Sequence, residues 1–164
     1  MSATRAPGRS TFPTASAKRP DDLRSRALRY LARREHSRDE LARKLAPYAE
    51  SPEILEGLLR ELESKKQLSN ERFAEARARS LARKYGARHI RQDLKSKGVS
   101  DEIVSNVSSA NELARARAIL KRKYHEPVSS REEHTRRARF LQSRGFSYDT
   151  IRSALSSSTN FSEE

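Results

Sequence analysis

The chain has 164 residues, of which 35 are Lys or Arg and 22 are Asp or Glu, giving a formal net charge of +13. Hydrophobic residues make up 34% and charged residues 35%, which argues against one large core and favours several small packed units. Positive charge on this scale suits a polyanion or an acidic protein surface as partner. Cysteine is absent, which excludes disulfides, thiolate zinc sites and a cysteine nucleophile and is compatible with the cytoplasmic location that we expect.

The first 20 residues contain four basic residues, no acidic residue and almost no bulky apolar side chain. Transit peptides share the lack of acid, but the proline-centred pieces here favour a disordered basic tail over residues 1–20. A second disordered tail is expected over residues 158–164. No apolar run approaches the roughly 20 residues needed to cross a bilayer, so we expect no membrane association.

The first predicted unit covers residues 21–68 and contains three helices. After an initial amphipathic helix, Ser37 and Glu40 form the capping-box pattern that begins the second helix. Pro47 ends it, because proline cannot continue the hydrogen-bond ladder. The third helix begins at Ser51–Glu53, where a capping serine precedes a proline and an acid. Its apolar stripe comprises Ile54, Leu55, Leu58, Leu59 and Leu62.

The second predicted unit covers residues 69–109. Its first helix starts near Asn70, and apolar residues keep helical spacing as far as Tyr85. Gly86 lets the chain turn into a second helix, which ends at Gly98, a residue type favoured after helix C-termini. A short third helix completes the unit.

The third predicted unit covers residues 110–157 and has the same plan. Its first helix starts at Asn111. Ser130 and Glu133 repeat the capping box, and Gly145 ends the second helix. No alternating apolar run and no tight hairpin pair indicates a strand anywhere in the chain. The predicted fold is therefore all-α, a tandem array of three three-helix repeats.

Internal repetition supports this division. The segment Leu94–Ser100 recurs as Leu141–Ser147 with a constant offset of 47 residues. Upstream, Arg34–Leu45 aligns with Arg83–Leu94 with an offset of 49 residues. A period in this range is typical of proteins built from small stacked helical units.

Positive charge gathers in the second and third units. Nine basic and two acidic residues lie between positions 72 and 98, and ten basic and three acidic residues lie between positions 115 and 144. Arg88, Arg91 and Lys95 recur at helical spacing, opposite the apolar residues of their helix. For any one of them a solvated helix face is the simpler interpretation, but few acids intersperse the set. The candidate partner- or DNA-contacting residues are Arg83, Lys84, Arg88, Arg91, Lys95, Lys97, Arg136, Arg137, Arg139 and Arg144.

No catalytic constellation is found. The four histidines are scattered without metal-ligand spacing and the five glycines form no phosphate-cradling loop, so we expect no enzyme, no metal and no cofactor. Tyr85 and Tyr124 could stack on bases, but closing the core is the simpler interpretation. Sequence-specific DNA reading by a helix-turn-helix unit is disfavoured, because few Asn or Gln residues accompany the basic ones.

Three segments, residues 27–45, 70–99 and 139–155, resemble the RecX family of bacterial recombinase regulators. The resemblance covers about Leu23 to Leu155. Its most specific marks are Arg34-Glu35-His36-Ser37 followed by Glu40-Leu41, the Arg72-Phe73-Ala74 helix leading to Gly86 and Ile90, and Arg144-Gly145-Phe146-Ser147. At the central turn this chain has Gly86-Ala87, where the family usually has Gly-Pro or a similar pair.

The resemblance implies an elongated, curved, right-handed array of three-helix repeats. It also implies a non-enzymatic monomer that binds the RecA filament on single-stranded DNA. There it would act mainly as an inhibitor of ATP hydrolysis, strand exchange and coprotease activity. From the charge pattern we expect the basic residues given above to form the contact strip. Two alternatives stay open: a nucleic-acid-binding module that competes for DNA, and a helical scaffold for another acidic protein.

Overall fold

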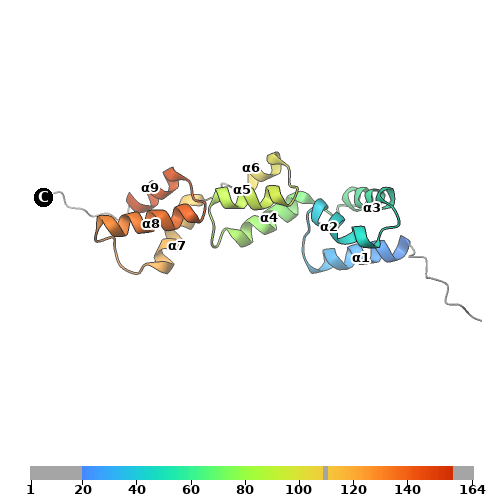
Figure 1. Cartoon of the computed structure of the whole chain (residues 1–164), viewed down its shortest axis with the longest axis horizontal. Helices are drawn as coiled ribbons and strands as arrows, with labels where there is room; N and C mark the ends of the chain where they lie inside the picture. Colours follow the sequence, from blue (N-terminus) through green and yellow to red (C-terminus); the bar gives the residue numbers. More distant parts are fainter. Residues whose placement is uncertain (1–19, 109–110, 157–164) are drawn as a thin grey trace, which may run out of the picture.

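The computed structural model describes residues 20–108 and 111–156, which form an elongated row of helical bundles (Figure 1). All regular structure in these residues is helical, as predicted. The disordered tails predicted at residues 1–20 and 158–164 lie outside the described residues, apart from Pro20, which opens the first helix.

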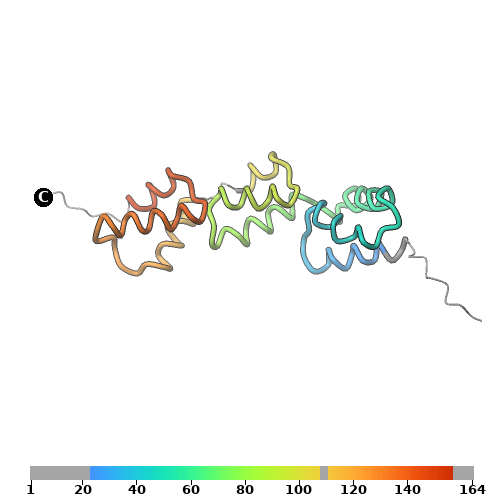
Figure 2. Tube along the Cα trace, in the orientation of Figure 1, coloured from blue at the N-terminus to red at the C-terminus, as the bar shows by residue number. Residues whose placement is uncertain are grey.

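Three units of three α-helices follow one another along the long axis, which confirms the predicted fold class (Figure 2). Unit 1 contains α1 (Pro20–Arg33), α2 (Arg38–Leu45), the 3-10 turn η1 (Ala46–Tyr48) and α3 (Pro52–Ser64). Unit 2 contains α4 (Asn70–Leu81), α5 (Ala87–Ser96) and α6 (Asp101–Ser108). Unit 3 contains α7 (Glu112–Lys123), α8 (Arg131–Ser143) and α9 (Tyr148–Ser156). The boundaries drawn between units from the sequence remain predictions.

Serine side chains begin several of these helices. The Oγ atoms of Ser37 and Ser130 accept the N–H groups of Glu40 and Glu133, both at 3.1 Å. Ser51 caps α3 in the same way, at 3.3 Å. Each cap satisfies an N–H group that has no partner within its helix, so local sequence is enough to fix these starts.

Each unit has a hydrophobic core of its own. The central buried side chains are Leu41, Leu45, Leu59 and Leu62 in unit 1, Phe73, Ile90, Leu94 and Val104 in unit 2, and Leu120, Leu141, Phe146 and Leu155 in unit 3. Small separate cores explain how a chain with so little apolar sequence folds, because every helix needs to bury only one narrow stripe.

Two details differ from the predictions. Ile54, expected in the buried stripe of α3, is 41% exposed. It lies at the edge of the stripe, one position and about 100° of rotation away from Leu55. The first helix of unit 2 ends at Leu81 and not at Tyr85. The Tyr85 ring instead stacks on the ring of His89, with centroids 3.9 Å apart.

Unit 3 supplies the hydrogen bonds that begin α5. The three contacts are Gly86 N–H to Arg144 O (2.8 Å), Ala87 N–H to Glu112 Oε1 (2.8 Å) and Arg88 N–H to Gly145 O (3.1 Å). The backbones approach so closely that a Cβ atom on Gly86 would lie 2.4 Å from the Gly145 carbonyl oxygen. The start of α5 and the end of α8 therefore meet in a joint that tolerates only glycine at position 86.

Polar contacts also join units 1 and 2. The Arg38 N–H group donates to Asn70 Oδ1 at 2.9 Å, which links the start of α2 to the start of α4. Arg72 Nε forms an ion pair with Glu35 Oε1 at 2.8 Å. Both contacts run between residues more than 30 positions apart, so they fix how one unit sits on the next.

Substituting Gly86 by Ala should weaken the joint between units 2 and 3. We expect a loss of about 1–3 kcal/mol of unfolding free energy, because the added methyl group collides with the Gly145 backbone. Gly57→Ala is the matched control, since nothing lies within 4 Å of a Cβ atom there. In the interior of α3 that change should stabilise by about 1 kcal/mol. Urea denaturation followed by circular dichroism measures the change in unfolding free energy for both variants. Equal changes for Gly86→Ala and Gly57→Ala would contradict a close backbone contact at Gly86.

Candidate functional site

The exposed basic residues of α5 and α8 form the candidate interface. Arg88 and Arg91 on α5 are exposed, while Ile90 and Leu94 of the same helix are buried. Lys95 is also exposed but pairs with Asp101 at 2.6 Å. Within residues 20–108 and 111–156, neither Arg88 nor Arg91 takes part in an ion pair. These two guanidinium groups are free to meet an anionic partner.

The second helix of unit 3 carries further exposed arginines. Arg136 and Arg139 are exposed on α8, and the described residues offer neither of them an ion-pair partner. α8 follows α5 along one side of the row, and its C-terminus meets the α5 N-terminus (Figure 1). The structure thus brings four of the expected residues, Arg88, Arg91, Arg136 and Arg139, onto two helices that meet end to end.

Arg137 does not belong to the exposed strip, contrary to the sequence-based expectation. Its side chain is buried, with 5% exposed, and it forms an ion pair with Glu133. It also donates to the Glu126 carbonyl oxygen at 2.8 Å, and its guanidinium lies 4.6 Å from the Tyr124 ring centre. Arg137 precedes the buried Leu141 by four positions, which places both on the inner face of α8. It is a core residue of unit 3.

Arg144 contributes to the joint between units 2 and 3. Its Nη1 atom donates to the Lys84 carbonyl oxygen at 3.0 Å, and its guanidinium lies 4.6 Å from the Phe140 ring centre. Arg122 makes a parallel contact, in which Nη2 donates to the Arg83 carbonyl oxygen at 2.7 Å. The side chains of Arg83 and Lys84 are exposed at this joint. Arg144 is therefore half-buried and structural, whereas its two neighbours remain accessible.

Lys97 lies apart from the other expected contact residues. It is half-buried and lines a hollow of about 360 Å³ between units 1 and 2. Arg34, Glu40, Phe73 and Arg77 share this hollow. The acidic Glu40 and the paired arginines around it leave little net positive charge there, so the hollow adds little to an anion-binding surface.

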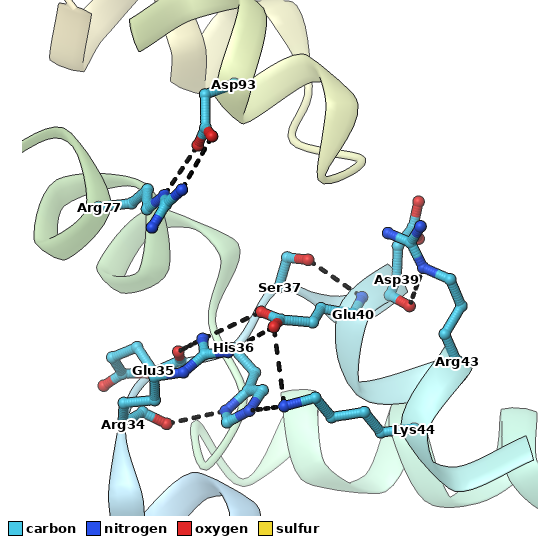
Figure 3. Close-up of polar contacts among 10 residues, drawn as sticks. All are labelled: Arg34, Glu35, His36, Ser37, Asp39, Glu40, Arg43, Lys44, Arg77 and Asp93. Carbon is cyan, nitrogen blue, oxygen red and sulfur yellow. Dashed lines mark hydrogen bonds and ion pairs between the residues drawn. The ribbon is translucent and has the colours of Figure 1, made fainter. Parts of the chain in front are cut away.

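A polar network at this boundary was not predicted (Figure 3). Arg34 donates to Glu40 through both terminal nitrogens, at 2.5 and 3.1 Å. These hydrogen bonds hold the pKa of the Glu40 carboxyl below its usual value, although partial burial opposes the shift. The Ser37–Glu40 capping box was visible in the sequence, but the pairing of Arg34 depends on where the chain turns before α2.

Buried His36 completes the network. Its Nδ1 atom lies 2.9 Å from the Arg34 carbonyl oxygen and its Nε2 atom 3.0 Å from Lys44 Nζ (Figure 3). An ammonium group can only donate, so Nε2 is the acceptor and Nδ1 carries the proton of a neutral ring. Burial, with the nearby charges of Arg34 and Lys44, lowers the pKa of His36.

A second unpredicted pair stiffens unit 2. Arg77 on α4 and Asp93 on α5 form two hydrogen bonds of 2.8 and 2.9 Å (Figure 3). This bidentate contact lowers the pKa of the Asp93 carboxyl. Because Asp93 lies between Arg91 and Lys95 in the sequence, the pair fixes the orientation of the helix that carries the exposed strip.

Comparison with known protein families identifies the whole array. Residues 24–59 match the family model "RecX, first three-helix domain", residues 69–107 match the second three-helix domain and residues 110–155 match the third. The chain belongs to the RecX family. The resemblance found in the sequence is thereby confirmed.

Named relatives agree with this assignment. A Herbaspirillum seropedicae protein named "Regulatory protein RecX" is 43% identical over 139 residues, covering 83% of this chain and 90% of its own length. A Neisseria meningitidis protein of the same name is 42% identical over 135 residues, covering 81% and 88%. The crystal structure of RecX from Lactobacillus salivarius shares the fold, with a TM-score of 0.72 at 20% identity over 84% of this chain and 95% of that one.

Two further features of the described residues concern membranes and metal ions. No helix among them is long and apolar enough to cross a membrane. Nor does the described part of the chain hold a group of three or more His, Asp or Glu side chains placed to bind a metal ion.

The neutral state of His36 predicts a dependence of stability on pH. Unfolded histidine titrates near its ordinary pKa of about 6.5, whereas folded His36 takes up its proton only at lower pH. The unfolding free energy should therefore be independent of His36 titration above about pH 6.5 and should decrease as the pH is lowered from there. This one group can account for at most about 1.4 kcal/mol per pH unit.

Urea denaturation between pH 7.5 and about 5 measures this slope. His36→Gln should flatten it, while the exposed His125→Gln serves as control and should leave it unchanged. An identical slope in all three proteins would contradict a neutral buried His36.

Proposed function

We propose that this protein is a cytoplasmic, non-enzymatic regulator, mainly an inhibitor, of the RecA recombinase. In this proposal the monomer binds the RecA filament on single-stranded DNA and restrains its ATPase, strand-exchange and coprotease activities. Membership of the RecX family, with relatives named regulatory proteins, supports a regulatory role. The observation that carries the proposal is the set of exposed, unpaired arginines on α5 and α8.

The geometry suits a partner with a repeating anionic surface. Arg88 and Arg91 stand on unit 2, and Arg136 and Arg139 stand on unit 3. The backbone joint at Gly86 holds the two helices in a fixed relation. Once one pair of arginines is bound, the other is presented at high effective concentration, which raises affinity without additional contacts. A nucleoprotein filament offers both acidic protein surface and phosphate at regular intervals.

Direct binding of single-stranded DNA is the second candidate function. Tyr148 on α9 favours it, because this residue is 77% exposed and a base could stack on its ring. The other candidate rings are engaged inside the protein. Tyr124 packs edge-on against Phe140 with centroids 5.9 Å apart, and Tyr85 stacks on His89. One exposed aromatic ring is a small platform for a strand, so filament binding remains the preferred proposal.

The DNA-dependent ATPase of purified RecA, titrated with this protein at two DNA concentrations, separates the two candidates. A filament regulator should inhibit at ratios well below one per RecA protomer, and added DNA should not relieve the inhibition. Inhibition that excess DNA abolishes would instead support competition for DNA.

Reversing the charge of the α5 strip tests the proposed contact. The variant Arg88→Glu, Arg91→Glu, Lys95→Glu should keep its helical content, because all three side chains are exposed. If each exposed charge contributes about 0.5–1 kcal/mol, the loss of all three should lower filament affinity by about tenfold to a hundredfold. The control Arg29→Glu, Arg33→Glu, Arg60→Glu makes the same change of net charge on exposed residues of unit 1. Equal inhibition by the strip variant and the wild type would refute the contact.

A further inference from the structure

A groove between α4 and α7 is a second candidate surface, formed by helices other than those that carry the strip. Its volume is about 810 Å³. The floor is apolar and is formed by Ala82 and Ala118, with the buried Ile119 behind them. The rim is basic and includes Arg79, Lys121 and Arg122. None of the described residues that line it is acidic, and Arg79 and Lys121 on its rim take part in no ion pair within the described part of the chain.

The groove is preformed. Arg122 Nη2 donates to the Arg83 carbonyl oxygen at 2.7 Å, which ties the last turn of α7 to the segment after α4. Ile119 is buried beneath the floor and belongs to the core of unit 3. Both walls are therefore anchored before any ligand arrives, which lowers the entropy lost on binding.

Helix dipoles explain only part of this arrangement. Cations in the last turn of a helix interact favourably with its negative end, and Arg79 and Lys121 occupy such positions. That role does not require an exposed apolar floor between them. Arg115 also lines the groove, and burial lowers the pKa of its guanidinium although the nearby Glu112 carboxylate opposes this shift. A carboxylate in the groove would favour the charged form of this guanidinium.

We propose that the α4–α7 groove binds an acidic peptide segment that carries apolar side chains. Its carboxylates would pair with the rim cations, and one or two apolar side chains would cover Ala82 and Ala118. A nucleic-acid strand fits less well, because no Phe or Tyr lines the groove and single-stranded bases bind chiefly by stacking on aromatic rings. This surface goes beyond the proposed function, which rests on α5 and α8.

Fluorescence anisotropy tests the groove with the full chain. The probes are a labelled Glu-rich peptide with Leu at helical spacing, the same peptide with Ser in place of Leu, and labelled oligothymidylate. The groove variant Arg79→Glu, Lys121→Glu leaves Arg83 untouched, because Arg83 also belongs to the expected strip. Ala118→Glu places a charge on the floor. Arg29→Glu, Arg33→Glu is the control with the same change of net charge.

We expect the Leu peptide to bind more tightly than the Ser peptide, and the groove variant to weaken it about tenfold. Ala118→Glu should weaken it as well, while the control should not. The strip variant should keep peptide binding, so that loss of filament inhibition and loss of peptide binding can be told apart. The proposal would be overturned if the wild type did not bind the Leu peptide. It would also be overturned if both groove variants bound this peptide as tightly as the wild type does. So would a groove variant that loses oligothymidylate but not peptide.

Discussion

The N-terminus of α5 has no side-chain cap of its own, and the third unit supplies what it lacks. Burial alone would raise the pKa of Glu112, but hydrogen bonds from Ala87 N–H, Thr150 and Ser147 lower it, so the carboxylate stays ionised at the positive end of the helix. The Glu112 contact ties the start of α5 to α7, and the hydrogen bonds from Gly86 and Arg88 tie it to the end of α8, so the position of the exposed strip depends on both. Because unit 3 provides these hydrogen-bond acceptors, the first N–H groups of α5 lack their partners when unit 3 is not folded against it.

The same construction occurs at both joints. Gly145, at the turn after α8, has φ +80° and lies against His89 near the start of α5. One unit earlier, Gly98 has φ +76° and lies against Asp39 near the start of α2. In each case the turn after the second helix of one unit packs on the start of the second helix of the preceding unit. A side chain would collide in either turn, so the glycines couple neighbouring units as well as ending helices.

Interactions between residues close in the sequence made the helices predictable. The roles of individual arginines could not be predicted in this way. Serine caps, glycine stops and apolar spacing act over a few residues, so the sequence was sufficient for them. Whether an arginine is exposed depends on residues distant in the chain. Arg137 satisfies carbonyl groups in a loop, and Arg144 reaches Lys84 across 60 positions. The sequence therefore predicted a basic face correctly for Arg88, while for Arg137 it could not distinguish a solvent-facing charge from a buried one.

Net charge is for this reason a poor measure of binding charge. Arg77, Arg137 and Arg144 form their hydrogen bonds within the array, so removing any of them would leave a carboxylate or carbonyl oxygen without its donor. The charge left for a partner is the smaller set that the described carboxylates do not pair. In units 2 and 3 that set includes Arg88, Arg91, Arg136 and Arg139 on α5 and α8, and Arg79 and Lys121 at the α4–α7 groove. The joint between units 2 and 3 positions both surfaces. A change that loosens this joint should therefore affect partner binding at either surface.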